Sequence, residues 1–278
     1  MKATKSPSCL SMKVMEIYEE GDAQFPAGDN FEFSYNPIAF RDSSTGNFLC
    51  ARTKYRYRGD EKPDPDTLDL IPIPLDEIWP LAWDYSLTQP PNPLPSNIYI
   101  KRPSLLGYEE FRHQYRLSDL ILSEVRVWEI LRRHPHPNIA RYQGTIVEDE
   151  RIVGLCFAKY GMTLAEWVQQ ISSRPLDKTH CFERINKGIQ HLHSLGLIHN
   201  DVQSIQCHVH RGWCSCAYWL WFLQGRGGKL GMKAGTMGWT DEAPEIAVWD
   251  DDYYRMHKLE EYLEIHLSAT ASENVQGR

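Results

Sequence analysis

The stretch Gly-Leu-Ile-His-Asn-Asp, residues 196–201, decides the fold. Gly196 is a residue type that often ends a helix, because glycine adopts a left-handed backbone without steric cost. The apolar pair Leu197-Ile198 predicts a short strand, which places His199 and Asp201 directly after it. On these residues alone, Asp201 could simply cap the turn that follows the strand.

Apolar residues at helical spacing predict helices on both sides of this stretch. One helix is expected over residues 162–171, with Thr163 as a cap, and a last one over residues 252–266. The helix that ends at Gly196 presents one apolar face, formed by Phe182, Ile185, Ile189 and Leu192.

Further upstream, Ser118 is a good N-cap for a helix that stops at His134-Pro135-His136-Pro137. The apolar face of this helix consists of Ile121, Val125, Trp128 and Leu131. Glu124 lies on or beside that face, and a buried carboxylate needs a cation or good donors. A strand over 97–101 precedes the helix, and strands over 138–147 and 151–158 follow it as a hairpin.

Composition excludes several classes of protein. The apolar content of 42% is enough for a core, while the net charge of −7 and the absence of a basic run argue against a nucleic-acid surface. The longest apolar run, 216–223, is shorter than the roughly 20 residues of a membrane span. Residues 1–20 lack the apolar centre of a secretory signal, and seven cysteines, an odd number, favour reduced thiols. We therefore expect an intracellular protein, cytoplasmic or nuclear, without nucleic-acid or membrane partners.

The first 95 residues differ from the rest. Residues 1–30 are mixed and polar, and we expect them to be poorly ordered. Short strands are predicted over 48–51 and 55–57, after a turn at 44–47. Ten of the 17 prolines fall within 63–103, which predicts an extended, irregular segment. We expect an N-terminal extension over 1–95 and a domain over 96–278.

The order of these elements resembles the eukaryotic protein kinases: a strand with a lysine, a helix with an inward glutamate, a hairpin, a helix and His-x-Asp. The resemblance runs from about Asn97 to His266 and is closest to divergent kinase-like proteins of filamentous fungi. It implies an α+β, bilobal fold with an N-lobe over about 96–158 and a C-lobe over about 159–278. Only 33 residues follow Glu245, so the helical C-lobe is expected to be incomplete.

The resemblance also implies roles for individual residues. Lys101 would hold the phosphates of ATP, and Glu124 would pair with Lys101. His199 and Asp201 would belong to the catalytic loop, with Asp201 orienting the substrate hydroxyl. Gln206 stands where the family has a magnesium-binding asparagine, which makes it a candidate Mg²⁺ ligand. The alternative for the first pair is a strand-edge lysine and a helix carboxylate bonded to something else.

Other matches are weaker. Asn200 replaces the arginine of His-Arg-Asp, which suggests that no phosphate switch on the activation loop operates. Residues 235–239 and Ala243-Pro244-Glu245 resemble the end of an activation segment. Asp252 resembles the aspartate that braces the catalytic loop, although it could equally be an ordinary helix N-cap.

The family pattern also breaks. No glycine lies between Gly59 and Gly107, so a glycine loop over the phosphates is absent or replaced by the proline-rich segment. No Asp-Phe-Gly occurs, and its place falls near Trp219-Leu220-Trp221. Tryptophan has no oxygen with which to ligate Mg²⁺, so phosphoryl transfer should be severely impaired.

The segment 204–226 has an unusual composition. It contains no acid, but it holds three of the nine tryptophans and three of the seven cysteines. One hypothesis is that this segment is read out of frame, which translating the neighbouring frames of the transcript would test. Several zinc-type ligands occur here, but their spacing does not match a structural zinc site: Cys207, His208, His210, Cys214 and Cys216.

Three functions are therefore open. The chain could be a kinase of Ser/Thr type that is weak or inactive, acting on a protein substrate with ATP and Mg²⁺. It could be a pseudokinase scaffold that acts by protein contact. It could also be the non-functional product of a frame-shifted gene.

Overall fold

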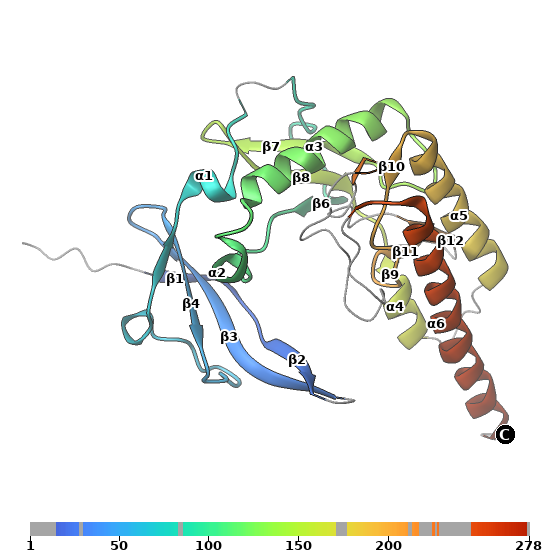
Figure 1. Ribbon diagram of the computed structural model, residues 1–278, viewed down its shortest axis with the longest axis horizontal. Coiled ribbons are helices and arrows are strands. Elements are labelled where there is room, and N and C mark those ends of the chain that lie inside the picture. Colours follow the sequence, from blue (N-terminus) through green and yellow to red (C-terminus); the bar gives the residue numbers. More distant parts are fainter. Residues whose placement is uncertain are drawn as a thin grey trace, which may run out of the picture. The chain divides into compact units, whose positions relative to one another are not determined.

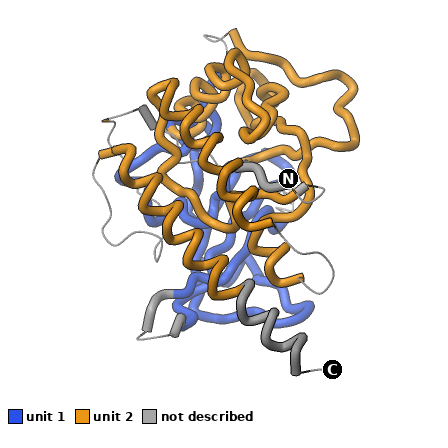
Figure 2. The backbone as a smooth tube through the Cα atoms, turned by 90° about the vertical axis from the view of Figure 1, so that its right-hand side faces the viewer, with its two compact units in different colours: residues 1–81, 103–119 blue, residues 82–102, 120–278 orange. Residues whose placement is uncertain are grey.

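The computed structural model describes residues 15–27, 30–82, 86–170, 177–210, 213–216, 224–225, 227 and 246–276. The fold is mixed α+β, and its strands pair antiparallel (Figure 1). The chain divides into two compact units, coloured separately in Figure 2. Unit 1 comprises residues 1–81 and 103–119, and unit 2 comprises residues 82–102 and 120–278.

Unit 1 is built on a sheet with strand order β1-β3-β4-β5, in which β2 also pairs with β3. Its strands are β1 (Met15–Glu20), β2 (Ala23–Ala27), β3 (Asn30–Asp42), β4 (Phe48–Thr53) and β5 (Ile71–Ile73). The short helices η1 (Pro65–Thr67), α1 (Leu75–Ile78) and α2 (Tyr108–Phe111) complete the unit.

Residues of β3 and β4 form the core of unit 1. Ile38 and Phe40 lie on one face of β3 and pack with Ala51 of β4, and Ala39 between them is also buried, so both faces of β3 are covered here. The expectation of poor order over residues 1–30 is wrong for β1 and β2, and residues 55–57 do not form a strand. The alternation Met15, Ile17 could have indicated β1, because both side chains pack on this core.

The first layer of unit 2 is a sheet with order β6-β8-β7. Its strands are β6 (Ile98–Lys101), β7 (Tyr142–Glu148) and β8 (Arg151–Ala158), and β7 and β8 form the predicted hairpin. Helix α3 (Leu117–Arg133) lies over this sheet (Figure 1). The contact is aromatic, because Trp128 of α3 packs edge-on against Phe157 of β8 with ring centroids 4.7 Å apart.

Helices dominate the rest of unit 2. Helix α4 (Leu164–Gln169) begins with a capping box between Thr163 and Glu166. Helix α5 (Lys178–Ser194) buries three of the four predicted apolar residues, Ile185, Ile189 and Leu192, whereas Phe182 is half-buried. It packs against α6 (Trp249–Gln276), which runs beside it in Figure 1.

Short strands connect these helices. They are β9 (Met162–Thr163), β10 (Leu197–Ile198), β11 (Cys207–His210), β12 (Trp213–Cys216) and β13 (Gln224–Gly225). Cys50, Cys156 and Cys207 are free thiols, whereas Cys181 is disulfide-bonded, so the expectation of reduced thiols is wrong at that position.

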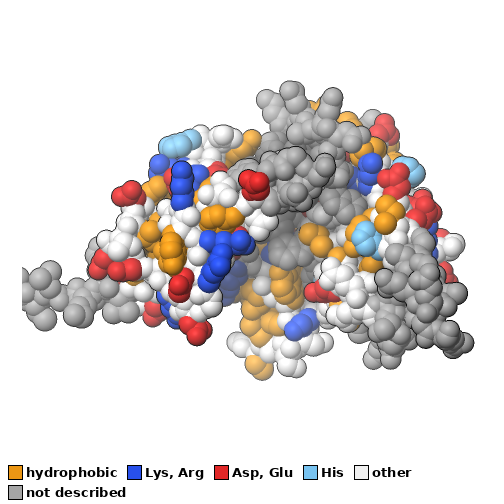
Figure 3. All heavy atoms as spheres, turned by 90° about the horizontal axis from the view of Figure 1, so that it is seen from below, with side chains coloured by type: hydrophobic (Ala, Val, Ile, Leu, Met, Phe, Trp, Pro, Cys, Tyr) orange, Lys and Arg blue, Asp and Glu red, His pale blue; other side chains and the backbone are white. Residues whose placement is uncertain are grey.

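The surface carries charges of both signs. On the face drawn in Figure 3, the described acidic and basic side chains are interspersed. Across the residues that the structure describes, no helix has both the length and the apolar character needed to cross a membrane.

The boundary between an N-terminal extension and a following domain near residue 95 stays a prediction.

Candidate functional site

Lys101 is the last residue of β6, where it pairs in register with Leu155 of β8. Its side chain is only 1% exposed, and Nζ donates to Oε1 of Glu124 on α3. The Glu124 side chain is 5% exposed. The sequence therefore located both members of a buried ion pair that joins a strand to the helix above it.

A second donor holds the Glu124 carboxylate in place. Trp128 lies one helical turn later, and its Nε1 donates to the same Oε1 atom at 3.3 Å. Burying two charges is costly, and the cost is offset only when geometry is good and further hydrogen bonds are made. The indole of Trp128 supplies such a bond, a role that the spacing i, i+4 could have indicated.

The predicted loop follows β10, as expected. Gly196 has φ = 72°, the left-handed conformation of a helix-ending glycine, and Asn200 has φ = 60°. His199, Asn200 and Asp201 are all buried.

Asp252 holds the backbone of this loop. Its Oδ2 accepts a hydrogen bond from the His199 N–H, and its Oδ1 accepts one from the Asn200 N–H, both at 2.8 Å. The ring Nε2 of His193 is 2.9 Å from Oδ2. Helix α6 begins three residues earlier, at Trp249, so Asp252 is not the N-cap of that helix.

Both carboxylate oxygens of Asp201 accept hydrogen bonds from side-chain amides. Oδ1 accepts from Nε2 of Gln203, and Oδ2 accepts from Nε2 of Gln206, each at 2.9 Å. The Asp201 N–H donates to Nδ1 of His199 at 3.2 Å, which leaves the proton of a neutral imidazole on Nε2. Burial lowers the pKa of His199, despite opposing charges on Asp252 and Asp201, so the ring is held neutral.

The side chain of Gln206 is the predicted ligand of Mg²⁺, and its surroundings show whether the loop could hold this ion. Its Oε1 is buried without a hydrogen-bond partner, so one amide oxygen is available to a cation. Mg²⁺ in nucleotide sites is usually bound through one or two carboxylates together with the phosphates. Within the described residues, no group of three or more His, Cys, Asp or Glu side chains could hold a metal. The carboxylate beside Gln206 is that of Asp201, whose two oxygens already accept amide hydrogens, and the sequence has no further acid before Asp241, so this donor set does not fit Mg²⁺.

Two participants were missed by sequence reasoning. Gln203 donates to Asp201, and Arg255 is buried near three carboxylates, those of Asp201, Asp252 and Asp251. Burial lowers the pKa of Arg255, and these carboxylates oppose that shift. Arg255 lies three residues after Asp252 and thus on the same face of α6, a signal that was present in the sequence.

The structure thus places the five predicted residues in two groups. Lys101 and Glu124 join β6 to α3, while His199, Asp201 and Gln206 share the loop after β10. Among the described strands, β6 pairs only with β8, so no strand carrying a glycine loop is seen beside Lys101.

Several predictions cannot be compared with the structure. Residues 219–221, 235–239 and 243–245 lie outside the described residues. Of the zinc-type ligands, Cys207, His208 and His210 lie on β11, and Cys214 and Cys216 lie on the paired strand β12. Cys207 is a free, buried thiol. Burial lowers the pKa of His208 to about 4.

Comparison with known proteins supports part of this picture. No family model matches the chain. A stretch of 90 residues, 31% of the chain, is 32% identical to the human dual specificity testis-specific protein kinase 1. The match spans 14% of the length of that relative. The chain is therefore similar to a protein kinase over about a third of its length.

Proposed function

We propose that this chain is a protein-kinase-like domain whose inherited chemistry is transfer of the ATP γ-phosphate to a protein Ser or Thr hydroxyl. The observation that carries the proposal is the buried pair of Lys101 and Glu124. A strand lysine paired with a glutamate of the following helix is the arrangement with which kinases hold nucleotide phosphates. An N-lobe and a C-lobe, an intracellular location and the fungal likeness belong to this proposal.

The residues have distinct roles in this scheme. Lys101 contacts the phosphates, and Glu124 keeps its ammonium in position. Asp201 orients the hydroxyl, while His199 accepts from the N–H of Asp201 and Asp252 holds the backbone directly before it. The missing metal carboxylate weakens transfer, because Mg²⁺ normally neutralises charge between the β- and γ-phosphates.

A second function, a pseudokinase scaffold, is favoured by the state of Asp201. Both of its oxygens already accept amide hydrogens, and its residue is only 1% exposed. A substrate hydroxyl would have to compete with these amides for a lone pair. The partner in that case would be another protein.

Phosphoryl transfer from ³²P-labelled ATP to casein, with Mg²⁺ present, tests the kinase proposal. We expect slow labelling that Asp201→Asn abolishes, since the amide keeps the shape but accepts less strongly. Labelling that survives this substitution would contradict the role of Asp201.

Melting temperature in the presence of ATP separates the remaining alternatives. A rise that Lys101→Ala removes, without any labelling, identifies a pseudokinase. No rise together with a low melting temperature supports a non-functional product, and the transcript across residues 201–230 would then show whether a neighbouring frame restores Asp-Phe-Gly.

A further inference from the structure

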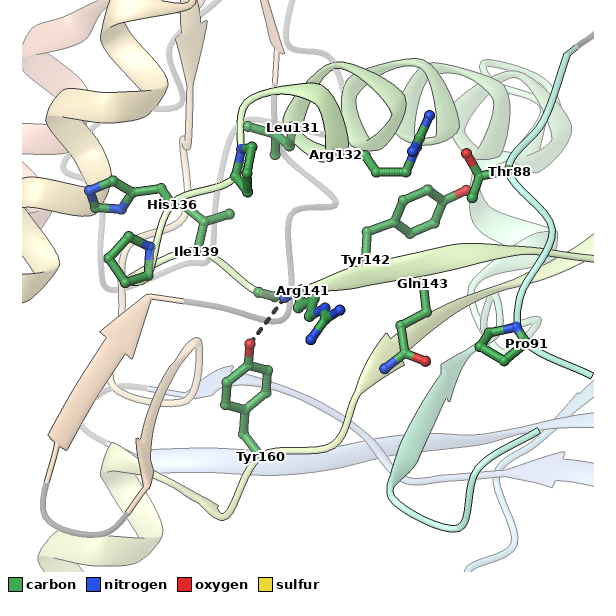
Figure 4. A pocket seen from close by; sticks show the side chains of 13 residues that line it. Thr88, Pro91, Leu131, Arg132, His136, Ile139, Arg141, Tyr142, Gln143 and Tyr160 are labelled. Atoms are coloured by element: carbon green, nitrogen blue, oxygen red, sulfur yellow. Dashed lines mark hydrogen bonds between the residues drawn. The ribbon is translucent and has the colours of Figure 1, made fainter. Parts of the chain in front are cut away.

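Unit 2 contains a cavity of about 860 Å³ that none of the predicted site residues lines (Figure 4). It lies beside the end of α3, the connection from α3 to β7, and the start of β7. Volumes of 300–1,000 Å³ are typical of small-molecule sites. The cavity is therefore large enough for a ligand separate from any nucleotide.

The proline-rich segment forms one wall of the cavity, and hydrogen bonds to α3 and β7 hold this wall in place. Thr88 donates from its N–H and its Oγ1 to the two oxygens of Glu129, each at 2.9 Å. The Thr145 N–H donates to the Thr88 carbonyl at 2.8 Å. Gly144 allows this approach, since a Cβ there would stand 2.5 Å from the backbone nitrogen of Pro90. Such a wall is preformed, which limits the entropy cost of binding.

The interior of the cavity is largely apolar. Four of the side chains that line it are buried, those of Leu131, Ile139, Ala140 and Tyr142. Figure 4 shows Tyr142 extending toward Thr88, with Tyr160 on the other side of Arg141. The Tyr160 hydroxyl accepts from the Arg141 N–H at 3.0 Å, which fixes the second ring. Aromatic walls of this kind suit a flat apolar body.

The charged side chains that line the cavity are all cationic: Arg132 and Arg141, with no Asp or Glu among the lining residues. Arg132 is partly neutralised, because its Nε lies 3.4 Å from Glu129. Arg141 is exposed and has no ion pair within the described residues. An uncompensated guanidinium beside an apolar wall, in a chain of net charge −7, points to an anionic group on the ligand.

His136 contributes a donor rather than a charge. Its Nδ1 accepts from the Asn138 N–H at 3.2 Å, so the proton of the neutral ring is on Nε2. Burial lowers its pKa, and the neighbouring His191 and Arg184 lower it further. No carboxylate of α5 is among the groups that affect this ring.

We propose that this cavity binds a small amphipathic carboxylate, with an aromatic body against Tyr142 and Ile139 and its carboxylate on Arg141. Arg141 acts as the specificity residue, because a guanidinium can bind both carboxylate oxygens. The proposal does not depend on nucleotide binding by the chain.

Two probes of one shape test it: 2-naphthoate and the neutral 2-naphthamide, titrated into the full chain by isothermal calorimetry. We expect naphthoate to bind at least fivefold more tightly than naphthamide. Arg141→Gln should weaken naphthoate about five- to tenfold and leave naphthamide unchanged. ATP should not displace naphthoate.

Arg133→Gln is the control for Arg141→Gln. Arg133 is an exposed arginine in the last turn of α3, next to the lining residue Arg132, but it does not line the cavity itself. Gln143→Trp, which fills the cavity from β7, should abolish binding of both probes. Equal binding of the two probes, no binding at millimolar concentration, or naphthoate binding that persists in Gln143→Trp would overturn the proposal. So would an equal loss in Arg133→Gln and Arg141→Gln.

Discussion

Asp252 accepts a 2.8 Å hydrogen bond from the backbone N–H of Asn200, a residue held at φ = 60°. Few residues other than glycine adopt this conformation, although asparagine tolerates it best. A buried carboxylate on α6 thus stabilises a backbone turn that would otherwise be unfavourable, directly before Asp201. The order of the loop depends on this contact.

Replacing Asp252 by alanine should be strongly destabilising. It leaves the N–H groups of His199 and Asn200 buried without acceptors and removes a counter-charge from Arg255, so we expect a loss of about 3–5 kcal/mol. Urea unfolding followed by circular dichroism measures it. Asp250→Ala, on the exposed side of the same turn, should change stability by less than about 0.5 kcal/mol. Equal effects of the two substitutions would show that Asp252 does not brace the loop.

The left-handed backbone of Asn200 should determine which substitutions position 200 tolerates. Asn200→Ala and Asn200→Gly both remove the side chain, but the left-handed backbone conformation is strained for alanine and not for glycine. We expect the glycine variant to be more stable by about 1 kcal/mol, the reverse of the usual order. Thermal unfolding of both variants decides it, and an alanine variant as stable as the glycine one would mean that the turn relaxes.

Gly144 should not tolerate a side chain. Gly144→Ala places a Cβ within 2.5–2.7 Å of the backbone at 88–90, and φ is 140° there, so we expect a loss of at least about 2–3 kcal/mol. Gly196→Ala is the control for backbone conformation alone. Its φ is 72°, but nothing lies within 4 Å of the added Cβ, so about 1 kcal/mol should be lost. Comparable losses would mean that the proline-rich segment moves aside at little cost.

Stability should fall as the solution is made acidic, because buried histidines are neutral in the fold. The pKa of His208 is lowered by burial to about 4, against about 6.5 in an unfolded chain. The unfolded state therefore takes up a proton first, and stability is lost as the pH falls from about 6.5 to about 4.

We expect this histidine to account for about 1–3 kcal/mol between pH 7 and pH 4. His208→Gln should flatten the pH dependence of unfolding measured in urea. His257→Gln, on the exposed surface of α6, should leave it unchanged. An unaltered slope in His208→Gln would contradict the prediction.

Sequence periodicity predicted the elements that carry the site. Helix α3 and the hairpin of β7 and β8 begin and end within a few residues of the predicted positions, and α5 ends as predicted before Gly196, since apolar spacing and stop signals agree. Glu124 was predicted to face inward because it interrupts an apolar face, and it is buried.

Other features could not be predicted because they depend on contacts between distant segments. Arg255 shares a face of α6 with Asp252, but its position near Asp201 requires the loop and α6 to come together. The cavity combines residues 88–91 with residues 131–143, and the prolines of the first segment predicted only an irregular connection. Strands β1 and β2 were missed because the polar composition of residues 1–30 outweighed a short alternation.

We infer that Lys101 and Glu124 form a phosphate-binding pair. Lys101→Met alone should cost about 3–5 kcal/mol, because it leaves Glu124 buried without its cation. Adding Glu124→Leu should recover most of that loss. A surface pair next along the chain, Arg102 and Glu148 at 3.3 Å, provides the control in the double variant Arg102→Gln, Glu148→Gln.

Isothermal titration of ATP into the parent chain and these two double variants is the most direct measurement. We expect the parent and the Arg102, Glu148 variant to bind ATP alike, and the folded Lys101→Met, Glu124→Leu variant to bind ATP at least tenfold more weakly. Equal ATP affinity in all three proteins would contradict it.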